Sequence, residues 1–403
     1  MTTTRTALVI GAGIAGPVAA MALEKAGIQA TVYEAYPSTA DDAGTFLTVA
    51  SNGIDALRTI GADRPVLAPG FPTPAIMLRS ATGKNLGAAR TGLALPDGTT
   101  SHTLKRADLH RALYDEAARR GIVVEHGKRL TRAEQAGDGV RAVFADGSDA
   151  SGDVLIGADG IHSAVRRLID GNAPAPRYVG LINLGGYTRG VPVDTESGSY
   201  TMIFGKRAFF GYALAPGGEV WWFANVPHGD EPVRGEVEAV TAGAWQRRLA
   251  ELYSRDAGPA VRLVEASDTA IMKASLTHSL PHLPTWHKGR MIVIGDAAHA
   301  PTPSSGQGAS LSIEDAVVLA KCLRDLPREE AFAAYERLRR ARVERIAKAA
   351  ARVNSSKAAG PVARVFRDAL LPVVLKLTAS SKQASEQYRY HIDWNAPSSL
   401  VTG

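Results

Sequence analysis

Chemistry in this sequence centres on Arg290–Ala316, which reads RMIVIGDAAHAPTPSSGQGASLSIEDA. The apolar run Met291–Ile294 predicts a buried strand that delivers the carboxylate of Asp296 at its end. A proline-rich turn follows, and the glycines of Gly306–Gly308 open a helix. A carboxylate accepts hydrogen bonds from hydroxyls, while a helix N-terminus offers amide donors and a positive dipole end. The stretch therefore suits an extended ligand that carries hydroxyls at one end and develops negative charge at the other.

A second ligand-binding pattern, G-x-G-x-x-G, occupies Gly11–Gly16. It follows a continuous apolar run, Ala7–Ile10, of the kind expected for a central parallel strand. Pro17–Ala26 then has helical character, and Gln29–Tyr33 predicts a second strand that is followed by Glu34. With both strands, the helix and the acid in place, the pattern predicts the binding of an adenine dinucleotide.

Each glycine of this pattern has its own physical task. Gly11 permits the tight turn, Gly13 lets the backbone approach a pyrophosphate, and Gly16 lets the helix pack on the strand. The helix N-terminus attracts the phosphates, and Glu34 accepts a hydrogen bond from a ribose hydroxyl. The pattern by itself does not choose between NAD and FAD.

The bulk composition narrows the class of protein. A chain of 403 residues allows two or three domains, and 45% hydrophobic with 21% charged residues is typical of a soluble globular protein. The single cysteine, Cys322, excludes a disulfide framework and a cysteine-rich metal site, and it favours a reducing compartment. There is no apolar run of membrane-spanning length and no apolar N-terminal signal segment. We therefore expect a cytoplasmic protein.

The formal net charge of +6 is concentrated in Arg337–Lys348, RLRRARVERIAK. Its basic residues alternate with an acid and with apolar residues at helical spacing, and aromatic residues that could stack on bases are missing. A solvated helix face explains this segment better than a nucleic-acid patch does. We expect no nucleic-acid partner, and both a monomer and a homodimer stay open.

The pattern of predicted elements changes along the chain. Alternating strands and helices, typical of a Rossmann-like domain, occupy three pieces at 1–74, 99–176 and 278–330. Short strands that contain most of the aromatic residues predict an antiparallel β-sheet domain for substrate at 75–98 and 177–277. Residues 331–403 indicate a C-terminal helical region. The expected fold class is therefore α/β, with a dinucleotide-binding domain, an antiparallel sheet domain and added helices.

Three motifs stand in a fixed order along the chain: GAGIAG at Gly11–Gly16, GADGIHSAVR at Gly157–Arg166 and GDAAHAPTPSSGQG at Gly295–Gly308. Spaced in this way around an aromatic-rich sheet, they resemble the single-component class A flavin monooxygenases built on the para-hydroxybenzoate hydroxylase fold. The run AGTFLTVASNG at Ala43–Gly53 is most similar to the tetracycline-inactivating and salicylate-hydroxylase-like branches of that family. The resemblance covers the whole chain and implies FAD as the bound dinucleotide.

The resemblance also implies roles for individual residues at the adenine and ribityl ends of FAD. Arg106 matches an arginine near the ribityl and pyrophosphate groups, and Leu130 matches a position that contacts adenine through its backbone. Asp159 lies in an Asp-Gly motif associated with both FAD and NAD(P)H. The residues expected to bind this part of the cofactor are Gly11, Gly13, Ala15, Gly16, Glu34, Arg106, Leu130 and Asp159.

At the chemical end of the flavin, Gly295 and Asp296 match the pair that holds a ribityl hydroxyl. Gly308 and Ala309 match backbone donors near the pyrimidine edge of the ring, and Pro303 matches a proline that lines the reaction site. His299, in contrast, is expected to be a structural hydrogen-bonding residue, because no partner metal ligands stand near it. No metal site is expected.

The reaction implied by the resemblance has three parts. NADH or NADPH reduces FAD, O2 adds to form a C4a-hydroperoxide, and one oxygen passes to an aromatic or other electron-rich small molecule, with hydroxylation as the simplest outcome. This chemistry needs no nucleophile, so we assign no residue a covalent or acid–base role. Two alternatives stay open: a flavin-dependent reductase or oxidase of the same fold, and a flavoprotein scaffold that binds without turnover.

The substrate face is predicted from the strand Val220–Val226, whose alternate residues point to opposite sides. Val220, Trp222, Ala224 and Val226 form a wholly apolar set, whereas the other set includes one polar residue. Ligand cavities are mostly apolar with a few polar anchors, so the second set is predicted, although both could be sheet core. With neighbouring residues, the predicted pocket comprises Thr201, Phe210, Tyr212, Trp221, Phe223, Asn225 and Pro303.

Overall fold

The computed structural model describes residues 4–38, 45–357, 361–378 and 386–398. Its central layer is a six-stranded sheet in the order β18-β19-β12-β1-β2-β8, parallel except for the antiparallel edge strand β18. The strands are short and apolar, as expected where both faces of a sheet are covered. They are β1 (Thr6–Ile10), β2 (Gln29–Tyr33), β8 (Val123–Glu125), β12 (Val154–Gly157), β18 (His287–Lys288) and β19 (Met291–Val293).

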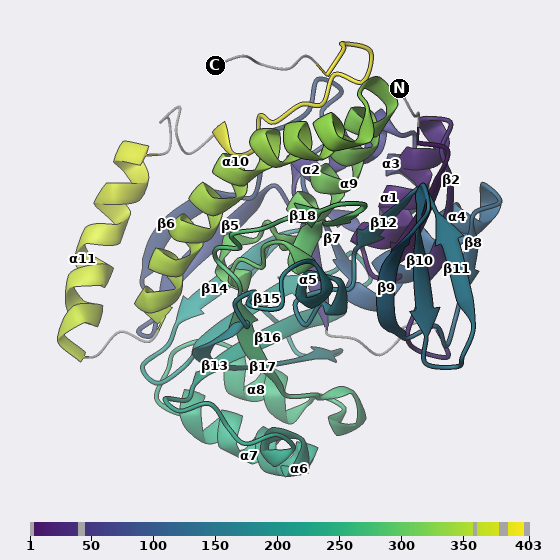
Figure 1. The fold of residues 1–403 in the computed structure, drawn as a ribbon. Coiled ribbons are helices and arrows are strands. Elements are labelled where there is room, and N and C mark those ends of the chain that lie inside the picture. The colour runs from purple at the N-terminus through teal and green to yellow at the C-terminus, as the bar shows by residue number, and fades with distance from the viewer. Residues whose placement is uncertain (1–3, 39–44, 358–360, 379–385, 399–403) are drawn as a thin grey trace.

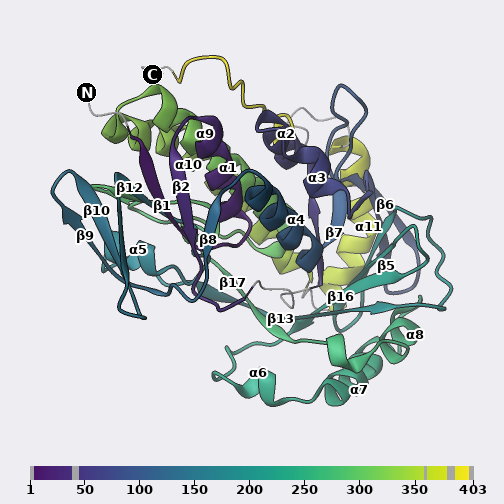
Figure 2. The same ribbon diagram turned by 90° about the vertical axis from the view of Figure 1, so that its right-hand side faces the viewer.

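Helices cover one face of this sheet, and a small antiparallel sheet covers the other (Figure 2). Helix α1 (Ala15–Lys25) is the crossover from β1 to β2, and it packs along α9 (Gly308–Asp325). On the far side, β9 (Leu130–Ala136), β10 (Gly139–Phe144) and β11 (Asp149–Gly152) form a three-stranded sheet that contacts β1 and β12. Both faces of the central strands are therefore covered, while Val123 of the edge strand β8 stays exposed.

A second large sheet has seven strands in the order β17-β13-β16-β15-β14-β5-β6 (Figure 1). Its neighbouring strands are antiparallel except for the parallel pair β14–β5. Two of its strands come from a distant part of the sequence. The members are β5 (Ala75–Ser80), β6 (Asn85–Arg90), β13 (Arg177–Thr188), β14 (Tyr200–Phe204), β15 (Phe209–Leu214), β16 (Val220–Pro227) and β17 (Ser275–Ser279).

A three-stranded sheet, β3 (Phe46–Val49), β7 (His102–Lys105) and β4 (Phe71–Pro72), lies where the two large sheets approach each other. Aromatic contacts join it to β16, because Phe46 and Phe71 lie 5.8 and 5.0 Å from Trp221 between ring centroids. Helix α4 (Arg106–Arg119) follows β7 directly and buries Leu109 and Leu113. The small sheet thus places the start of α4 at the junction.

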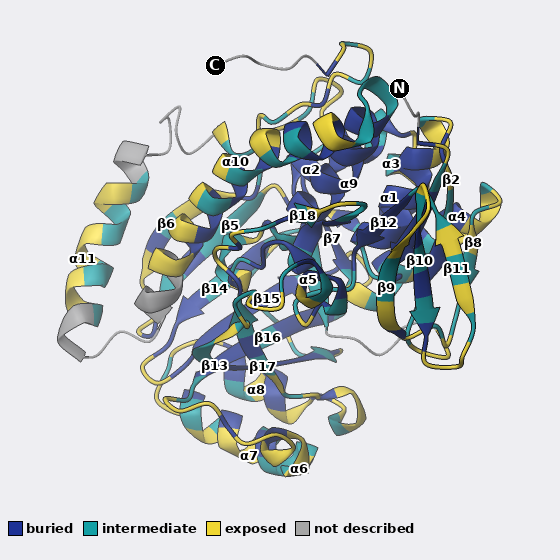
Figure 3. Ribbon diagram, viewed as in Figure 1, coloured by how far each residue is buried: buried dark blue, intermediate teal, exposed yellow. Residues whose placement is uncertain are grey.

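The remaining helices cover outer faces of the molecule. Helices α7 and α8 pack on the seven-stranded sheet, and α10 packs along α9. Buried and exposed positions alternate along α10, so Arg337–Lys348 is solvated on one side only, and its buried Arg339 and Arg342 depart from the solvated face that was expected (Figure 3). These helices are α2 (Ser51–Thr59), α3 (Asp63–Leu67), α5 (Ala164–Ile169), α6 (Glu236–Ala239), α7 (Ala242–Tyr253), α8 (Ala260–Glu265), α10 (Arg328–Lys357) and α11 (Pro361–Thr378), with short 3-10 turns η1 (Thr269–Ile271), η2 (Gly295–Ala297) and η3 (Pro303–Ser305).

The expected fold class is confirmed: the chain combines a parallel α/β layer, an antiparallel sheet and C-terminal helices. Ala43 and Gly44 of the run that resembles two flavin monooxygenase branches lie outside the described residues. So do 358–360, 379–385 and 399–403 of the region expected to be helical. Among the described residues, no helix combines the length and apolar content that crossing a bilayer requires.

Candidate functional site

The glycine-rich loop has the geometry that its sequence predicts. Gly11 has a positive φ of 102°, and a Cβ there would lie 2.6 Å from the backbone oxygen of Ala158. At Gly16 a Cβ would lie 1.9 Å from the oxygen of Gly11, so only glycine lets α1 pack this closely. At Gly13, by contrast, a Cβ would meet nothing within 4 Å. Gly11 and Gly16 serve the turn itself, while Gly13 faces open space where a ligand can approach.

Glu34 reaches this loop from the end of β2. Its Oε2 accepts a 2.7 Å hydrogen bond from the backbone N–H of Ala12, and its Oε1 accepts one of 3.0 Å from the N–H of Tyr36. The carboxylate therefore stands beside the glycine-rich turn, at the carboxyl edge of the parallel sheet. Leu130, at the start of β9, is buried in the core of the same layer. Ala15 is the first residue of α1.

The second motif forms a helix start in which Asp159 acts as a cap. Its carboxylate accepts from Ser163 Oγ at 2.5 Å and from the backbone N–H groups of Ala164 and Val165 at 2.7 and 3.1 Å. Burial raises the pKa of this carboxyl, against the opposing effect of these hydrogen bonds. Asp159 therefore stabilises the turn that precedes α5, and its expected contact with a dinucleotide stays a prediction.

Arg166, the last residue of the same motif, connects it to the third motif. This guanidinium is buried, and it donates from Nη1 to the carbonyl of Ala297 at 3.0 Å and from Nη2 to that of Ile161 at 2.7 Å. Ala297 lies in η2, directly after Asp296. The Asp-Gly turn and the Gly-Asp turn are therefore held together by one side chain.

Asp296 stands at the end of β19 with a carboxylate that has no hydrogen bond to any described residue. Burial raises its pKa, and the charges of His299 and Arg106 act in the opposite direction. Arg106 opens α4, and its backbone N–H donates to the carbonyl of Thr45 at 3.0 Å. The Asp296 residue is only partly buried, so a ligand can reach its carboxylate, and a ligand hydroxyl would donate to it.

The adenine-side and flavin-side motifs meet in space. Gly295 has a positive φ of 57°, and a Cβ built there would lie 3.3 Å from the Cβ of Ala15. Pro303 belongs to η3, which ends at Gly306 with a φ of 60°. Helix α9 then begins at Gly308, whose Cβ position has nothing within 4 Å. The first turn of α9, with Gly308 and Ala309, thus presents its N–H groups beside open space.

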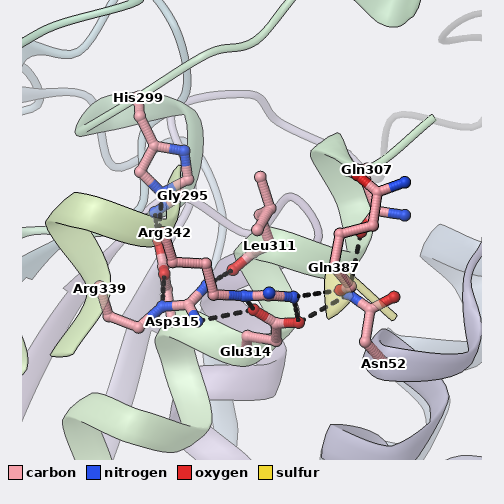
Figure 4. Close-up of polar contacts among 10 residues, drawn as sticks. All are labelled: Asn52, Gly295, His299, Gln307, Leu311, Glu314, Asp315, Arg339, Arg342 and Gln387. Atoms are coloured by element: carbon pink, nitrogen blue, oxygen red, sulfur yellow. Dashed lines mark hydrogen bonds and ion pairs between the residues drawn. The ribbon is translucent and has the colours of Figure 1, made fainter. Parts of the chain in front are cut away.

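A buried ionic network behind α9 holds this arrangement (Figure 4). Asp315 accepts from the backbone N–H of Gly295 at 2.9 Å, from His299 Nε2 at 2.6 Å and from Arg339 Nε at 2.6 Å. Burial works to raise the pKa of Asp315, but His299 and Arg339 outweigh it and hold the pKa well below its usual range. His299 thereby has the structural hydrogen-bonding role expected of it.

Glu314 extends the network to α2 and α10. It accepts from Asn52 Nδ2 at 2.6 Å and from both Nε and Nη2 of Arg342, at 2.9 and 2.8 Å. Asn52 also donates to Gln307 Oε1 at 2.9 Å, directly before α9. This network was not predicted from the sequence. One signal for it was available, because Glu314 and Asp315 interrupt an otherwise apolar helix face.

The seven-stranded sheet turns an aromatic face toward β3 and β4. Trp221 is buried against Phe46 and Phe71, and its Nε1 donates to Glu219 Oε2 at 2.8 Å. Phe223 lies on the same face, as does Asn225, whose Nδ2 donates to Asn183 Oδ1 at 2.8 Å. Lys105, adjacent to Arg106, pairs with Glu219 at 2.7 Å. The Lys105–Glu219 ion pair was likewise not predicted from the sequence.

Three residues predicted for this face lie on the opposite one. The register pairs Tyr212 with Trp222 and Thr201 with Tyr212, which places all three side chains together. Phe210 stacks on Trp222 with a 5.6 Å centroid separation and packs against Tyr253 of α7. The prediction that Phe210, Tyr212 and Thr201 join Trp221 was therefore wrong, because the strands pair one residue away from the register that it required.

The geometry fits an FAD molecule along the carboxyl edge of the parallel sheet. Gly13 and Gly308 border open space, Asp296 offers a carboxylate with no hydrogen bond to a described residue, and the two glycine-rich turns are adjacent. Adenine dinucleotides bind at this edge of such sheets. Among the described residues, no group of three or more His, Cys, Asp or Glu side chains is placed to hold a metal ion. Fold and site together define a flavin-dependent oxidoreductase.

Comparison with known proteins identifies the family. Residues 4–350 match the family described as FAD binding domain, and the chain belongs to it. The FAD-dependent urate hydroxylase of Klebsiella pneumoniae is 32% identical over 326 residues, which cover 79% of this chain and 81% of that protein. The 3-amino-4-hydroxybenzoate 2-monooxygenase PtmB3 of Streptomyces platensis is 34% identical over 366 residues, covering 84% and 85%.

Solved structures agree with this assignment. Klebsiella pneumoniae HpxO, solved in complex with FAD and uric acid, superposes with a TM-score of 0.83 at 27% identity and covers 95% of this chain and 96% of its own. The resemblance to class A flavin monooxygenases is thus confirmed, and the protein is an FAD-dependent monooxygenase.

Two glycine substitutions should separate binding from folding. We expect Gly13→Ala to fold normally but to retain FAD at least tenfold more weakly, because its Cβ projects into the space that a pyrophosphate needs. Gly16→Ala should fold poorly, because its Cβ collides with the oxygen of Gly11. Thermal unfolding of the FAD-free proteins and FAD titration measure the two effects. Equal thermal stability of both variants would contradict this division.

Removal of the Asp296 carboxylate should loosen the cofactor. We expect Asp296→Ala to lose bound FAD on gel filtration, because ribityl hydroxyls would lack the carboxylate that accepts from them. Asp296→Asn keeps a carbonyl oxygen at the same place and serves as the matched control. Flavin absorbance per protein should fall in the order wild type, Asp296→Asn, Asp296→Ala. Unchanged occupancy in the alanine variant would refute the assignment.

Breaking the buried ion network should be costly. Arg339→Met removes one cationic partner from each of the buried carboxylates of Glu314 and Asp315. We expect the free energy of unfolding to fall by about 3–5 kcal/mol. Arg345→Met, exposed on the same helix, should change it by less than about 0.5 kcal/mol. Since pairing lowers the folded pKa of Asp315, its contribution is present at neutral pH and declines as pH falls below about 4. Denaturant titrations at pH 7 and at about pH 3 should show the difference between wild type and Arg339→Met narrowing on acidification.

Proposed function

We propose that this enzyme uses NADH or NADPH to reduce its FAD and transfers one oxygen atom from O2 to a planar, electron-rich aromatic or heteroaromatic small molecule. The observation that carries the proposal is the aromatic face of β16, which stands opposite β3 and β4 at the junction of the two large sheets. Relatives named for urate and for 3-amino-4-hydroxybenzoate act on compact rings of this kind. The cofactor, when bound, supplies the electron transfer and the oxygen chemistry.

The residues of the chain would position the cofactor and the substrate, stabilise negative charge and exclude water from the site. Asp296 would hold the ribityl chain, and the N–H groups of Gly308 and Ala309 would stabilise negative charge near the first turn of α9. Trp221 and Phe223 would exclude water from the reacting ring. The Asn183–Asn225 pair is the polar element of this face, and it would orient the substrate through hydrogen bonds.

The enzyme activity can be tested with purified protein. We expect a yellow protein whose NADH or NADPH oxidation is accelerated by its substrate, in a screen that begins with uric acid and 3-amino-4-hydroxybenzoate. Under ¹⁸O2 the product should contain one labelled oxygen. Product formation without label would instead support a reductase or oxidase. Protein that takes up no FAD would exclude both readings.

Trp221 should matter for substrate more than for cofactor. We expect Trp221→Ala to weaken substrate affinity by roughly tenfold or more, with FAD content unchanged, because the aromatic face loses its largest side chain. Trp221→Phe and Trp222→Phe make the same chemical change on opposite faces of β16 and form the control pair. The former should alter the substrate titration and the latter only stability. The reverse pattern would show that Trp221 belongs to the core alone.

A further inference from the structure

Helix α11 carries an apolar face that points away from the rest of the protein. It is the outermost element beside β6, the edge strand of the seven-stranded sheet (Figures 1 and 3). Leu371 and Leu375 pack inward against the cluster around Leu86 and Phe204. The outer side of the helix exposes five large apolar side chains, with fractional exposures of 49–70%: Val365, Phe366, Leu370, Val373 and Val374.

The spacing of these residues makes one continuous stripe. Positions 366, 370 and 373 follow the i, i+4, i+7 pattern that places side chains on one helix face, and Val365 extends it sideways. Of the ten large apolar side chains that are exposed among the described residues, five lie on this one helix, and apolar side chains gathered in this way mark an interaction surface. The helix thus has apolar residues on its inner side, which packs on the protein, and on its outer side, which is exposed.

Basic groups surround the stripe. Lys84 Nζ lies 3.5 Å from the carbonyl of Asp368, and Arg364 donates to the carbonyl of Lys206, so the exposed turns that carry Lys84 and Lys206 flank the helix. Among the described side chains of α11, the one carboxylate is Asp368, and it is already paired with Arg367 at 2.7 Å. The rim of the apolar stripe is therefore positive.

We propose that the outer face of α11 binds the surface of an anionic phospholipid membrane. An apolar stripe with a basic rim fits the boundary between acyl chains and negative headgroups. The helix lies along the protein surface and would rest in the plane of the membrane without crossing it, in keeping with its mixed composition.

A second copy of the chain fits this face less well. An isologous contact would bring the Lys84 and Lys206 turns of two copies toward each other, so that like charges would oppose association. The same charges favour a surface rich in phosphatidylglycerol.

Vesicle flotation of the full-length protein tests the proposal. We expect wild type to float with vesicles of equimolar phosphatidylcholine and phosphatidylglycerol, and to float much less with pure phosphatidylcholine. Flotation should also fall in 0.5 M salt, because the Debye length shrinks from about 10 Å at 0.1 M salt to about 3 Å at 1 M. Phe366→Asp with Leu370→Asp should reduce the floated fraction at least tenfold. Val233→Asp, at an apolar side chain that is 76% exposed elsewhere, is the matched control and should float like wild type.

Flavin content and thermal unfolding verify that each variant is folded, and Phe366→Ser offers a milder change should the double variant prove unstable. Wild type that stays out of the vesicle fraction would overturn the proposal. Equal flotation of wild type and both α11 variants would do so too. If sedimentation shows a dimer that Phe366→Ser dissociates, with no flotation of wild type, the face is a contact between two copies instead.

Discussion

The arrangement of this protein depends on one buried interaction, the hydrogen bonding of Asp315 to the backbone of Gly295. The carboxylate reaches from α9 to the turn that ends β19, and His299 and Arg339 surround it. An unpaired buried charge would be very costly, so these partners must all be in place together. As a result, the strand end that carries Asp296 and the helix whose first turn carries Gly308 keep a fixed relation to each other.

Further contacts connect the other two motifs to this strand end and helix. Arg166 binds the carbonyl of Ala297 and so connects the second motif to the third, while Gly295 lies against Ala15 of the first. Asn52 and Gln307 add α2 to the assembly. Three glycine-rich turns from distant parts of the chain therefore form one edge, as an extended dinucleotide requires. FAD-dependent monooxygenases use this edge to hold a cofactor, and the aromatic face of β16 closes the junction opposite it.

Much of the fold could be predicted from local patterns. Short apolar strands, glycine turns and helix starts are determined mainly by residues close to them in the sequence. The residues themselves therefore predict β1, α1, β2 and the start of α9. The buried network was less accessible. Glu314 and Asp315 stand out within an apolar helix, but their partners Arg339 and Arg342 lie in α10, in a segment whose charges read as solvated. Arg339 and Arg342 continue the three- and four-residue spacing of the buried Phe332, Tyr335 and Ile346, but an arginine at such a position is expected to be solvated until its carboxylate partner is known.

The sequence by itself determined that a dinucleotide binds, that the cofactor edge combines three motifs, and that Trp221, Phe223 and Asn225 share one side of their strand. These conclusions depend on spacing within a segment. Only the tertiary structure decided which residues of the neighbouring strand join them. Side chains alternate with a period of two, so the pairing of Phe209 rather than Phe210 with Asn225 moves Phe210 and Tyr212 into the core under α7. Register is set by contacts between strands, and a single strand does not contain that information.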